Sequence, residues 1–349
     1  MVLWAGWKPA APPGSGSCDS GARGVIGETE SPEPAEGRLP PGQRPVRLRG
    51  QRGDRGDRVP PYVRGPGGLV RAPQKTQYRQ HAMAQQIPPR LVATDLDGTI
   101  IRGDGTISSR TIAAFARVEQ AKARFVLVTG RPPRTMTEMA RAFGHRGTAI
   151  VSNGALSYDM RTGQVTAVRL IQPEQLAAAV KALRYAIPGI GIAVEYPDGR
   201  AIDHLYQPTM FDVDNPGPRY DDAALTSRPA AKLLGRHVGY SCDDLLAIAS
   251  PALRGLVAVT HSSANCLIEA AAIGVSKAST LALLAKEDGI DASEVIAFGD
   301  QPNDLPLLTW AGTSYAVANA HPDVLAAATH VIASNDDDGV AQVLEGLFP

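Results

Sequence analysis

The chain has 349 residues, and its 35 basic side chains (Lys and Arg) balance 35 acidic ones. This balance excludes a strongly basic nucleic-acid binder and a strongly acidic solvating chain. It is the sum of two unlike segments, because residues 1–82 carry 13 basic and 7 acidic side chains and residues 83–349 carry 22 and 28. No apolar run approaches the ~18 residues of a membrane span, so we expect no membrane partner.

Residues 1–82 have the composition of a segment that packs no hydrophobic core. They contain 14 Gly and 12 Pro and have neither the strand period nor the helix period. Three interpretations stay open. The one we favour is a non-native or mis-assigned leader, with the real start at Met83; the others are a disordered tail without a specific role and an Arg/Gly-rich segment that contacts RNA or anionic lipid. We predict a disordered extension over 1–82 and expect no nucleic-acid partner beyond weak contacts of this segment.

The cysteines and the N-terminus indicate the compartment. Cys18, Cys242 and Cys266 are odd in number and far apart in the sequence. This pattern predicts reduced thiols instead of a disulfide framework or a zinc site. The N-terminus lacks the continuous apolar region of a secretory signal. We therefore expect a cytoplasmic protein.

From residue 91, short apolar runs alternate with segments of helical period. Strands are predicted over 91–94, 125–128 and 149–152, with helices over about 109–122 and 135–143 between them. This alternation is typical of βαβ units, which form parallel sheets. It returns late in the chain, where helices are predicted over about 276–286, 303–310 and after Pro322, and strands over 295–298, 315–317 and 330–332.

The middle of the chain has a looser pattern. A hairpin is predicted at Arg161-Thr162-Gly163, then a helix after Pro173 and a strand over 191–196. Few of its signals are those of a parallel sheet, so we predict an inserted α+β domain in a doubly wound α/β fold. The predicted boundaries are 88–162 for the first part of the core, 163–262 for the insert and 263–349 for the second part of the core.

Polar motifs follow the first two predicted strands. Asp95-Leu96-Asp97-Gly98-Thr99 comes directly after the strand 91–94. In extended chain, residues two apart point the same way, so we expect both carboxylates on one side. Thr129-Gly130-Arg131 ends the second strand with a hydroxyl and backbone N–H groups suited to phosphate oxygens.

Two further motifs follow late in the chain. Lys277 is placed at a helix start, where a cation and free N–H groups can meet an anion. Gly299-Asp300-Gln301-Pro302-Asn303-Asp304 follows the strand 295–298, and burying its acids carries a desolvation cost that needs an offset. Each motif alone has an ordinary explanation, such as an Asx turn or a solvated lysine. All four together lie at the carboxyl edge of the predicted sheet, where doubly wound folds bind ligands.

This ordered set resembles the haloacid dehalogenase superfamily of phosphohydrolases. With Ser152-Asn153-Gly154-Ala155, the motifs are similar to its Cof-like branch, subclass IIB. The resemblance covers 88–349 and implies that the insert is a cap domain over the active site. One departure is Leu307, where the family often has Met, and this apolar exchange leaves the catalytic motifs intact.

The resemblance implies a role for each motif residue. Asp95 would attack phosphorus to form an aspartyl-phosphate, and Asp97 would protonate the leaving oxygen and then deprotonate water. Mg²⁺ would be held by Asp95, Asp300 and the Asp97 carbonyl, since crowded carboxylates need a cation. The remaining residues would bind the phosphoryl group or substrate (Thr129, Gly130, Lys277 and Asn303) or support the metal ligands from behind (Asp304).

The implied function is an Mg²⁺-dependent phosphatase of small phosphorylated metabolites, sugar phosphates first. Two alternatives stay open: a phosphotransferase or phosphomutase with the same intermediate, and a non-catalytic phosphometabolite-binding protein. The sequence predicts no particular oligomeric state. Substrate contacts are sought among cap residues and two residues nearer the cleft: Glu195, Asp203, His204, Arg236 and His237, with Tyr158 and Arg131.

Overall fold

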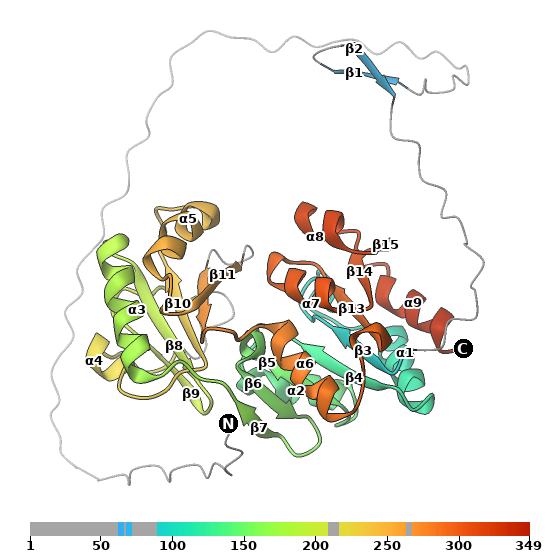
Figure 1. The fold of residues 1–349 in the computed structure, drawn as a ribbon, viewed down its shortest axis with the longest axis horizontal. Coiled ribbons are helices and arrows are strands. Elements are labelled where there is room, and N and C mark those ends of the chain that lie inside the picture. Colours follow the sequence, from blue (N-terminus) through green and yellow to red (C-terminus); the bar gives the residue numbers. More distant parts are fainter. Residues whose placement is uncertain (1–61, 66–67, 72–88, 209–215, 263–266) are drawn as a thin grey trace, which may run out of the picture. The chain divides into compact units, whose positions relative to one another are not determined.

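The structure is a computed structural model that describes residues 62–65, 68–71, 89–208, 216–262 and 267–349 (Figure 1). These residues belong to two compact units, and each is considered by itself. In the smaller unit, β1 (Tyr62–Gly65) pairs antiparallel with β2 (Gly68–Arg71). A Pro-Gly pair separates the two strands in the sequence, which is a common turn signal. Here the structure differs from the predicted disorder, and the rest of 1–82 lies outside the described residues.

The larger unit contains an eight-stranded sheet with the order β15-β14-β13-β3-β4-β5-β6-β7. Six strands run parallel, and a hairpin extends the sheet antiparallel at one edge. The parallel strands are β3 (Leu91–Thr94), β4 (Arg124–Val128), β5 (Thr148–Val151), β13 (Val295–Gly299), β14 (Thr313–Val317) and β15 (His330–Ile332), and the hairpin is β6 (Leu156–Asp159) with β7 (Gln164–Val168). The predicted doubly wound α/β core is confirmed.

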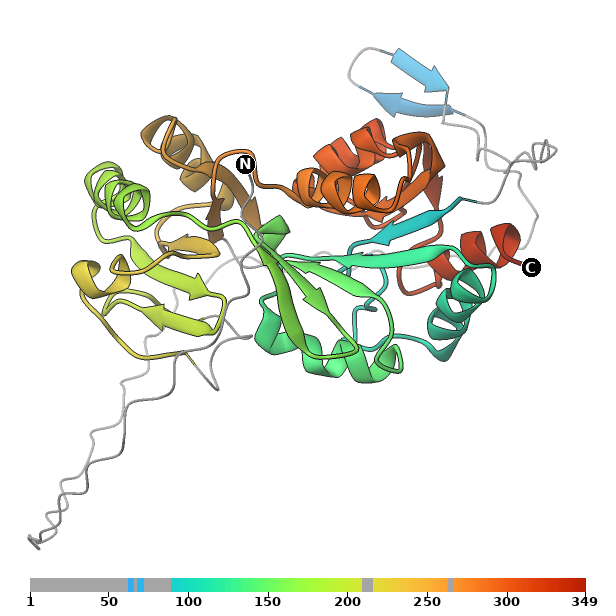
Figure 2. The same ribbon diagram turned by 60° about the horizontal axis from the view of Figure 1, so that its bottom comes forward.

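Helices cover both faces of this sheet. Helices α1 and α9 lie on one face, and α6, α7 and α8 lie on the other (Figure 2, teal and red against orange). The Ser108 side chain accepts the Thr111 N–H to begin α1, as expected for an N-cap serine. The helices of this domain are α1 (Ser109–Gln120), α2 (Met136–Ala142), α6 (Lys277–Glu287), α7 (Leu305–Trp310), α8 (Pro322–Ala327) and α9 (Gly339–Leu347), and the short 3₁₀ turns are Pro133–Thr135, Ser152–Gly154, Ala292–Glu294 and Pro302–Asp304.

The insert forms a five-stranded antiparallel sheet with the order β11-β12-β10-β8-β9. Helices α3 and α5 pack on one of its faces through a shared apolar cluster that includes Leu176, Leu245 and Ile268. The elements are α3 (Pro173–Ala186), β8 (Gly191–Tyr196), β9 (Gly199–Ile202), α4 (Asp222–Leu225), β10 (Lys232–Arg236), α5 (Cys242–Ala252), β11 (Ala258–Ser262) and β12 (Leu267–Ala271). This is the α+β domain that the sequence predicts, and we call it the cap.

The sheets end at different residues from the predicted domain boundaries. The predicted insert spans 163–262, yet β7 pairs with the core sheet and β12 pairs with the cap sheet. A short strand has the same two-residue alternation whichever sheet it joins. Its sheet is decided by its pairing partner, which the local pattern does not specify.

One cysteine differs from expectation. Cys242 is disulfide-bonded, and its partner lies outside the described residues. The prediction of reduced thiols is therefore wrong for Cys242, because separation along the sequence does not fix the distance between thiols in the folded chain. Among the described helices, none is both long enough and apolar enough to cross a bilayer.

Candidate active site

The Asp95 carboxylate lies where β3 leaves the sheet. The four residues of β3 are buried, and the Asp95 N–H continues the pairing by donating to the Phe298 carbonyl of β13. Only 5 % of Asp95 is exposed, and its Oδ1 accepts from Lys277 Nζ at 2.6 Å. Burial raises the pKa of Asp95 well above its ordinary value, nearby Asp304 and Asp300 raise it further, and Lys277 opposes the rise.

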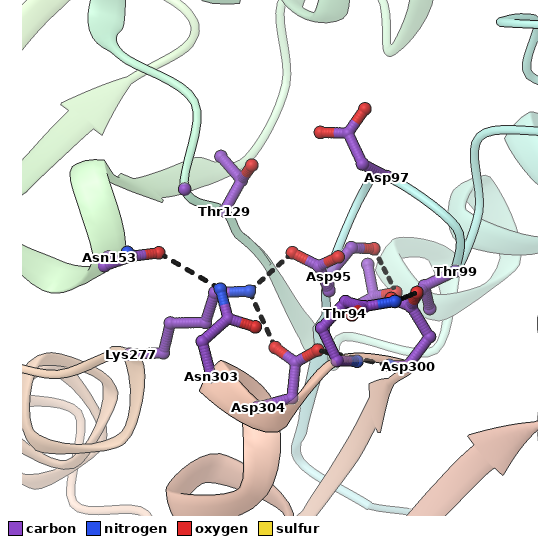
Figure 3. Close-up of polar contacts among 12 residues, drawn as sticks. Thr94, Asp95, Asp97, Thr99, Thr129, Asn153, Lys277, Asp300, Asn303 and Asp304 are labelled. Atoms are coloured by element: carbon purple, nitrogen blue, oxygen red, sulfur yellow. Dashed lines mark hydrogen bonds and ion pairs between the residues drawn. The ribbon is translucent and has the colours of Figure 1, made fainter. Parts of the chain in front are cut away.

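Lys277, the first residue of α6, joins two of the predicted motifs. Its Nζ donates to Asp95 Oδ1 and Asp304 Oδ1, both at 2.6 Å, and Figure 3 shows the ammonium between the two carboxylates. Burial opposes the charge, but Asp304 and Asp95 hold the pKa of Lys277 above its ordinary value. Gly154 explains how α6 comes so close, because an added Cβ at its φ of +102° would lie 2.2 Å from the Ser276 carbonyl oxygen.

The motif after β13 places two more carboxylates beside this ammonium. Asp304 Oδ2 accepts the N–H groups of Asp300 and Gln301 at 3.1 and 3.0 Å. Asp300 accepts from the Thr99 hydroxyl at 2.8 Å and from the Gln301 amide at 2.9 Å. Burial and Asp304 raise the pKa of Asp300 to about 6. Both oxygens of Asp304 are thus engaged within the protein, which fits a supporting place behind the other two acids.

These carboxylates fit a divalent cation. Ligand oxygens of Asp95, Asp300 and Asp304 lie within 4.8 Å of one another, and all three residues are buried. Buried like charges at this distance are costly unless a cation offsets them, and hard oxygen ligands suit Mg²⁺. Gly98 keeps the cluster open, since an added Cβ at its φ of +80° would lie 2.3 Å from Asp300 Oδ2.

Asp97 takes a different direction from the one that the sequence predicts. Its side chain is half exposed and, in Figure 3, points away from Asp95. The Arg131 guanidinium holds it through two hydrogen bonds, with Nε at 2.7 Å from Asp97 Oδ2. The expectation of two carboxylates on one side is wrong in this conformation, because β3 ends at Thr94 and the chain beyond it turns toward Gly98.

The Thr129-Gly130 turn and the amides of two other motifs complete the core side of the site. Thr129 is buried, and its Oγ1 accepts the Arg131 N–H at 3.0 Å. Asn303 Nδ2 donates to Asn153 Oδ1 at 3.4 Å, while Asn303 Oδ1 is buried without a hydrogen-bond partner among the described residues. The structure therefore brings all the predicted motifs to one edge of the sheet.

Side chains of the cap also contact this edge of the core sheet, and two of them, Lys232 and Glu269, were not predicted from the sequence. Lys232 Nζ donates to the Gly130 carbonyl at 2.9 Å, and Glu269 accepts from the Asn153 amide. Among the cap candidates, Glu195 pairs with Arg134 across the two domains. The sequence signal for Lys232 and Glu269 was a charge inside an otherwise apolar strand.

The remaining candidates lie in other surroundings. Asp203 pairs with Arg184 and accepts the N–H groups of Leu205 and Tyr206 within the cap. Arg236 donates to the Gln207 carbonyl, His237 packs on Tyr240, and His204 is exposed. Tyr158 belongs to the hydrophobic core of the larger sheet instead of the cleft.

We next compared the chain with known proteins. The model of the haloacid dehalogenase-like hydrolase family matches residues 92–344. The chain belongs to this family. The prediction from the sequence motifs is therefore confirmed, and so is the prediction of an enzyme.

The chain is also similar to curated phosphatases, and solved structures share its fold. The chain is 29 % identical over 275 residues to the 5-amino-6-(5-phospho-D-ribitylamino)uracil phosphatase of Escherichia coli strain K12, covering 73 % of this chain and 95 % of that protein. A Bacillus subtilis strain 168 phosphatase of the same name is 24 % identical and covers 74 % and 98 %. A Bacteroides thetaiotaomicron protein of the superfamily has a TM-score of 0.64 at 23 % identity, covering 76 % and 98 %. A subclass IIB sugar phosphatase has a TM-score of 0.62 at 20 % identity, covering 74 % and 99 %.

Proposed function

We propose that this protein is a Mg²⁺-dependent phosphatase that hydrolyses phosphate monoesters of small metabolites, with sugar or sugar-alcohol phosphates as the first class to test. The observation that carries the proposal is the buried cluster in which Lys277 bridges Asp95 and Asp304 beside Asp300. The phosphatase names of the two curated relatives support it, since both act on a phosphorylated ribityl compound.

Asp95 is the proposed nucleophile. Its carboxylate oxygen attacks phosphorus, the bond from phosphorus to the ester oxygen breaks, and an aspartyl-phosphate forms. Lys277 holds the nucleophile in place and brings a positive charge against the phosphoryl oxygens. Thr129, Gly130 and Asn303 are the proposed polar contacts of the transferred group, because the Thr129 hydroxyl, the Gly130 N–H and the Asn303 Nδ2 can donate to its oxygens.

Asp97 is the proposed acid and base. It gives a proton to the leaving oxygen in the first step and takes one from the water that hydrolyses the aspartyl-phosphate in the second. This role requires Asp97 to leave Arg131 and turn toward the scissile bond when substrate is present. Mg²⁺, when held by Asp95, Asp300 and the Asp97 carbonyl, would offset the negative charge of the phosphoryl group.

Phosphate release from a panel of phosphorylated metabolites tests the proposal. With Mg²⁺, the full chain should hydrolyse sugar and sugar-alcohol phosphates, Asp95→Asn should abolish turnover, and Asp97→Asn should slow it by about 10²–10⁴-fold. Glu174→Gln, at an exposed position on α3, is the matched control and should keep full activity. Absence of phosphate release from every compound would refute the proposal, and transfer of phosphate to an added sugar instead of water would establish the phosphotransferase alternative.

A further inference from the structure

Two charged cap residues are buried against the proposed phosphate-binding turn. Lys232 on β10 and Glu269 on β12 are only 4 % and 7 % exposed, and Lys232 Nζ lies 3.1 Å from Glu269 Oε2. Leu234 pairs directly with Glu269 across the two strands, so Lys232, two residues away, shares its face of the sheet. Their neighbours Leu233 and Ile268 face α3 and α5, so the ion pair lies on the opposite face.

The hydrogen bonds of this pair go to the core domain. Lys232 Nζ donates to the Gly130 carbonyl at 2.9 Å, and Glu269 Oε2 accepts from Asn153 Nδ2. Asn153 Oδ1 in turn accepts a hydrogen bond from Asn303 Nδ2. Polar contacts therefore connect two cap strands to three core motifs, those that contain Gly130, Asn153 and Asn303.

The core backbone that receives these contacts is itself held tightly. The N–H of Asn153 donates to the Thr129 carbonyl at 3.0 Å, and the N–H of Ser152 donates to the Arg131 carbonyl at 2.9 Å. Ser152 and Asn153 have φ values of +52° and +56°, which non-glycine residues rarely adopt without support from their surroundings. The cap supplies part of that support, because Glu269 fixes the Asn153 amide and Lys232 fixes the neighbouring carbonyl.

Stability alone is a weak reason for such a pair. Replacing a buried ion pair with apolar residues of similar size is often neutral or stabilising, since desolvation of two charges offsets their attraction. The pair lies instead where position matters most, on the turn that is proposed to bind the transferred phosphoryl group.

We propose that Lys232 and Glu269 are positioning residues. From the cap, they hold the Thr129-Gly130 turn and the Asn153 side-chain amide in the positions needed to bind phosphate. This inference rests on the proposed function for its kinetic consequence only. It makes the geometry of the phosphate site dependent on the cap, so that the site is complete when the cap contacts the core as it does here.

The decisive variant removes both charges. Lys232→Met alone leaves the Glu269 carboxylate buried without its cation and should lower the melting temperature. The double variant Lys232→Met/Glu269→Leu leaves no unpaired charge, so its melting temperature should fall less than that of Lys232→Met. In this variant neither the Gly130 carbonyl nor the Asn153 amide keeps its partner from the cap. We expect kcat/KM to fall by about tenfold to a hundredfold, and the inhibition constant of inorganic phosphate to rise in parallel.

Hydrogen–deuterium exchange measures the positioning without turnover. In the double variant, exchange should rise in peptides that cover 129–135 and 150–156 and stay unchanged in α9. Lys181→Met and Glu174→Gln, both at exposed positions on α3, remove the same charges from the other face of the cap and should change neither exchange nor kinetics.

The outcomes separate the two proposals. Unchanged exchange in both peptides, or native kcat/KM in the double variant, would overturn the positioning role. Absence of turnover in the unaltered chain would count against the proposed function, whereas the exchange result would still decide whether Lys232 and Glu269 position the turn.

Discussion

The buried Asp300 carboxyl predicts an unusual dependence of stability on pH when Mg²⁺ is removed. Burial and the neighbouring Asp304 raise the pKa of Asp300 from 3.8 to about 6. In the unfolded chain this carboxyl titrates near its ordinary value. Between about pH 4 and pH 6 the folded chain therefore binds more protons than the unfolded chain, and the contribution of Asp300 to stability falls as pH rises.

The pKa difference sets an upper magnitude. Each pKa unit corresponds to 1.36 kcal/mol, so Asp300 destabilises the metal-free fold by at most about 3 kcal/mol at pH 7 relative to pH 4. Only 2 % of the residue is exposed, so solvent screening does little to reduce this value. A bound divalent cation favours the charged carboxylate and should cancel the effect.

Urea denaturation of the unaltered chain and of Asp300→Asn, from pH 4.5 to pH 7, measures the effect. Other acids titrate in the same range, so the quantity of interest is the difference between the two proteins at each pH. In EDTA, the unaltered chain should lose stability relative to Asp300→Asn as pH rises, and saturating Mg²⁺ should reverse the order at pH 7. Parallel pH profiles in EDTA would refute the reasoning, because Asp300 would then titrate alike in the folded and unfolded chains.

Three further perturbations test single contacts of the site. Lys277→Met leaves two buried carboxylates without their shared ammonium and should destabilise the fold by about 3–5 kcal/mol. Urea denaturation measures this change, and a loss of about 1 kcal/mol or less would contradict the buried bridge. Gly98→Ala places a Cβ against the Asp300 carboxylate and should weaken Mg²⁺ activation by at least tenfold in the activator titration, whereas the open Gly105→Ala should not. Arg131→Met removes the partner that Asp97 must leave, so kcat for an alkyl phosphate, whose leaving group needs a proton, should fall no more than kcat for p-nitrophenyl phosphate. A larger loss for the alkyl phosphate would contradict this role, because Asp97 would then act while bound to Arg131.

The sequence alone determined the core and its motifs. The strand 91–94 agrees residue for residue, and the late helix and strands agree to within one or two residues, because short buried runs and N-cap serines are local signals. The motifs also needed no tertiary knowledge to be placed together. Parallel strands bring their carboxyl ends to one edge of the sheet, so Asp95, Thr129 and Asp300 had to meet there.

The tertiary structure decided what sequence neighbours do not encode. The sheet that β7 and β12 join depends on pairing partners, and the direction of Asp97 depends on a turn and on Arg131. Lys232 and Glu269 follow the same rule. Within their own strands they are isolated charges. Their proposed role becomes visible only when folding places the cap strands against Gly130 and Asn153, because a buried charge is costly unless it is paired and hydrogen-bonded.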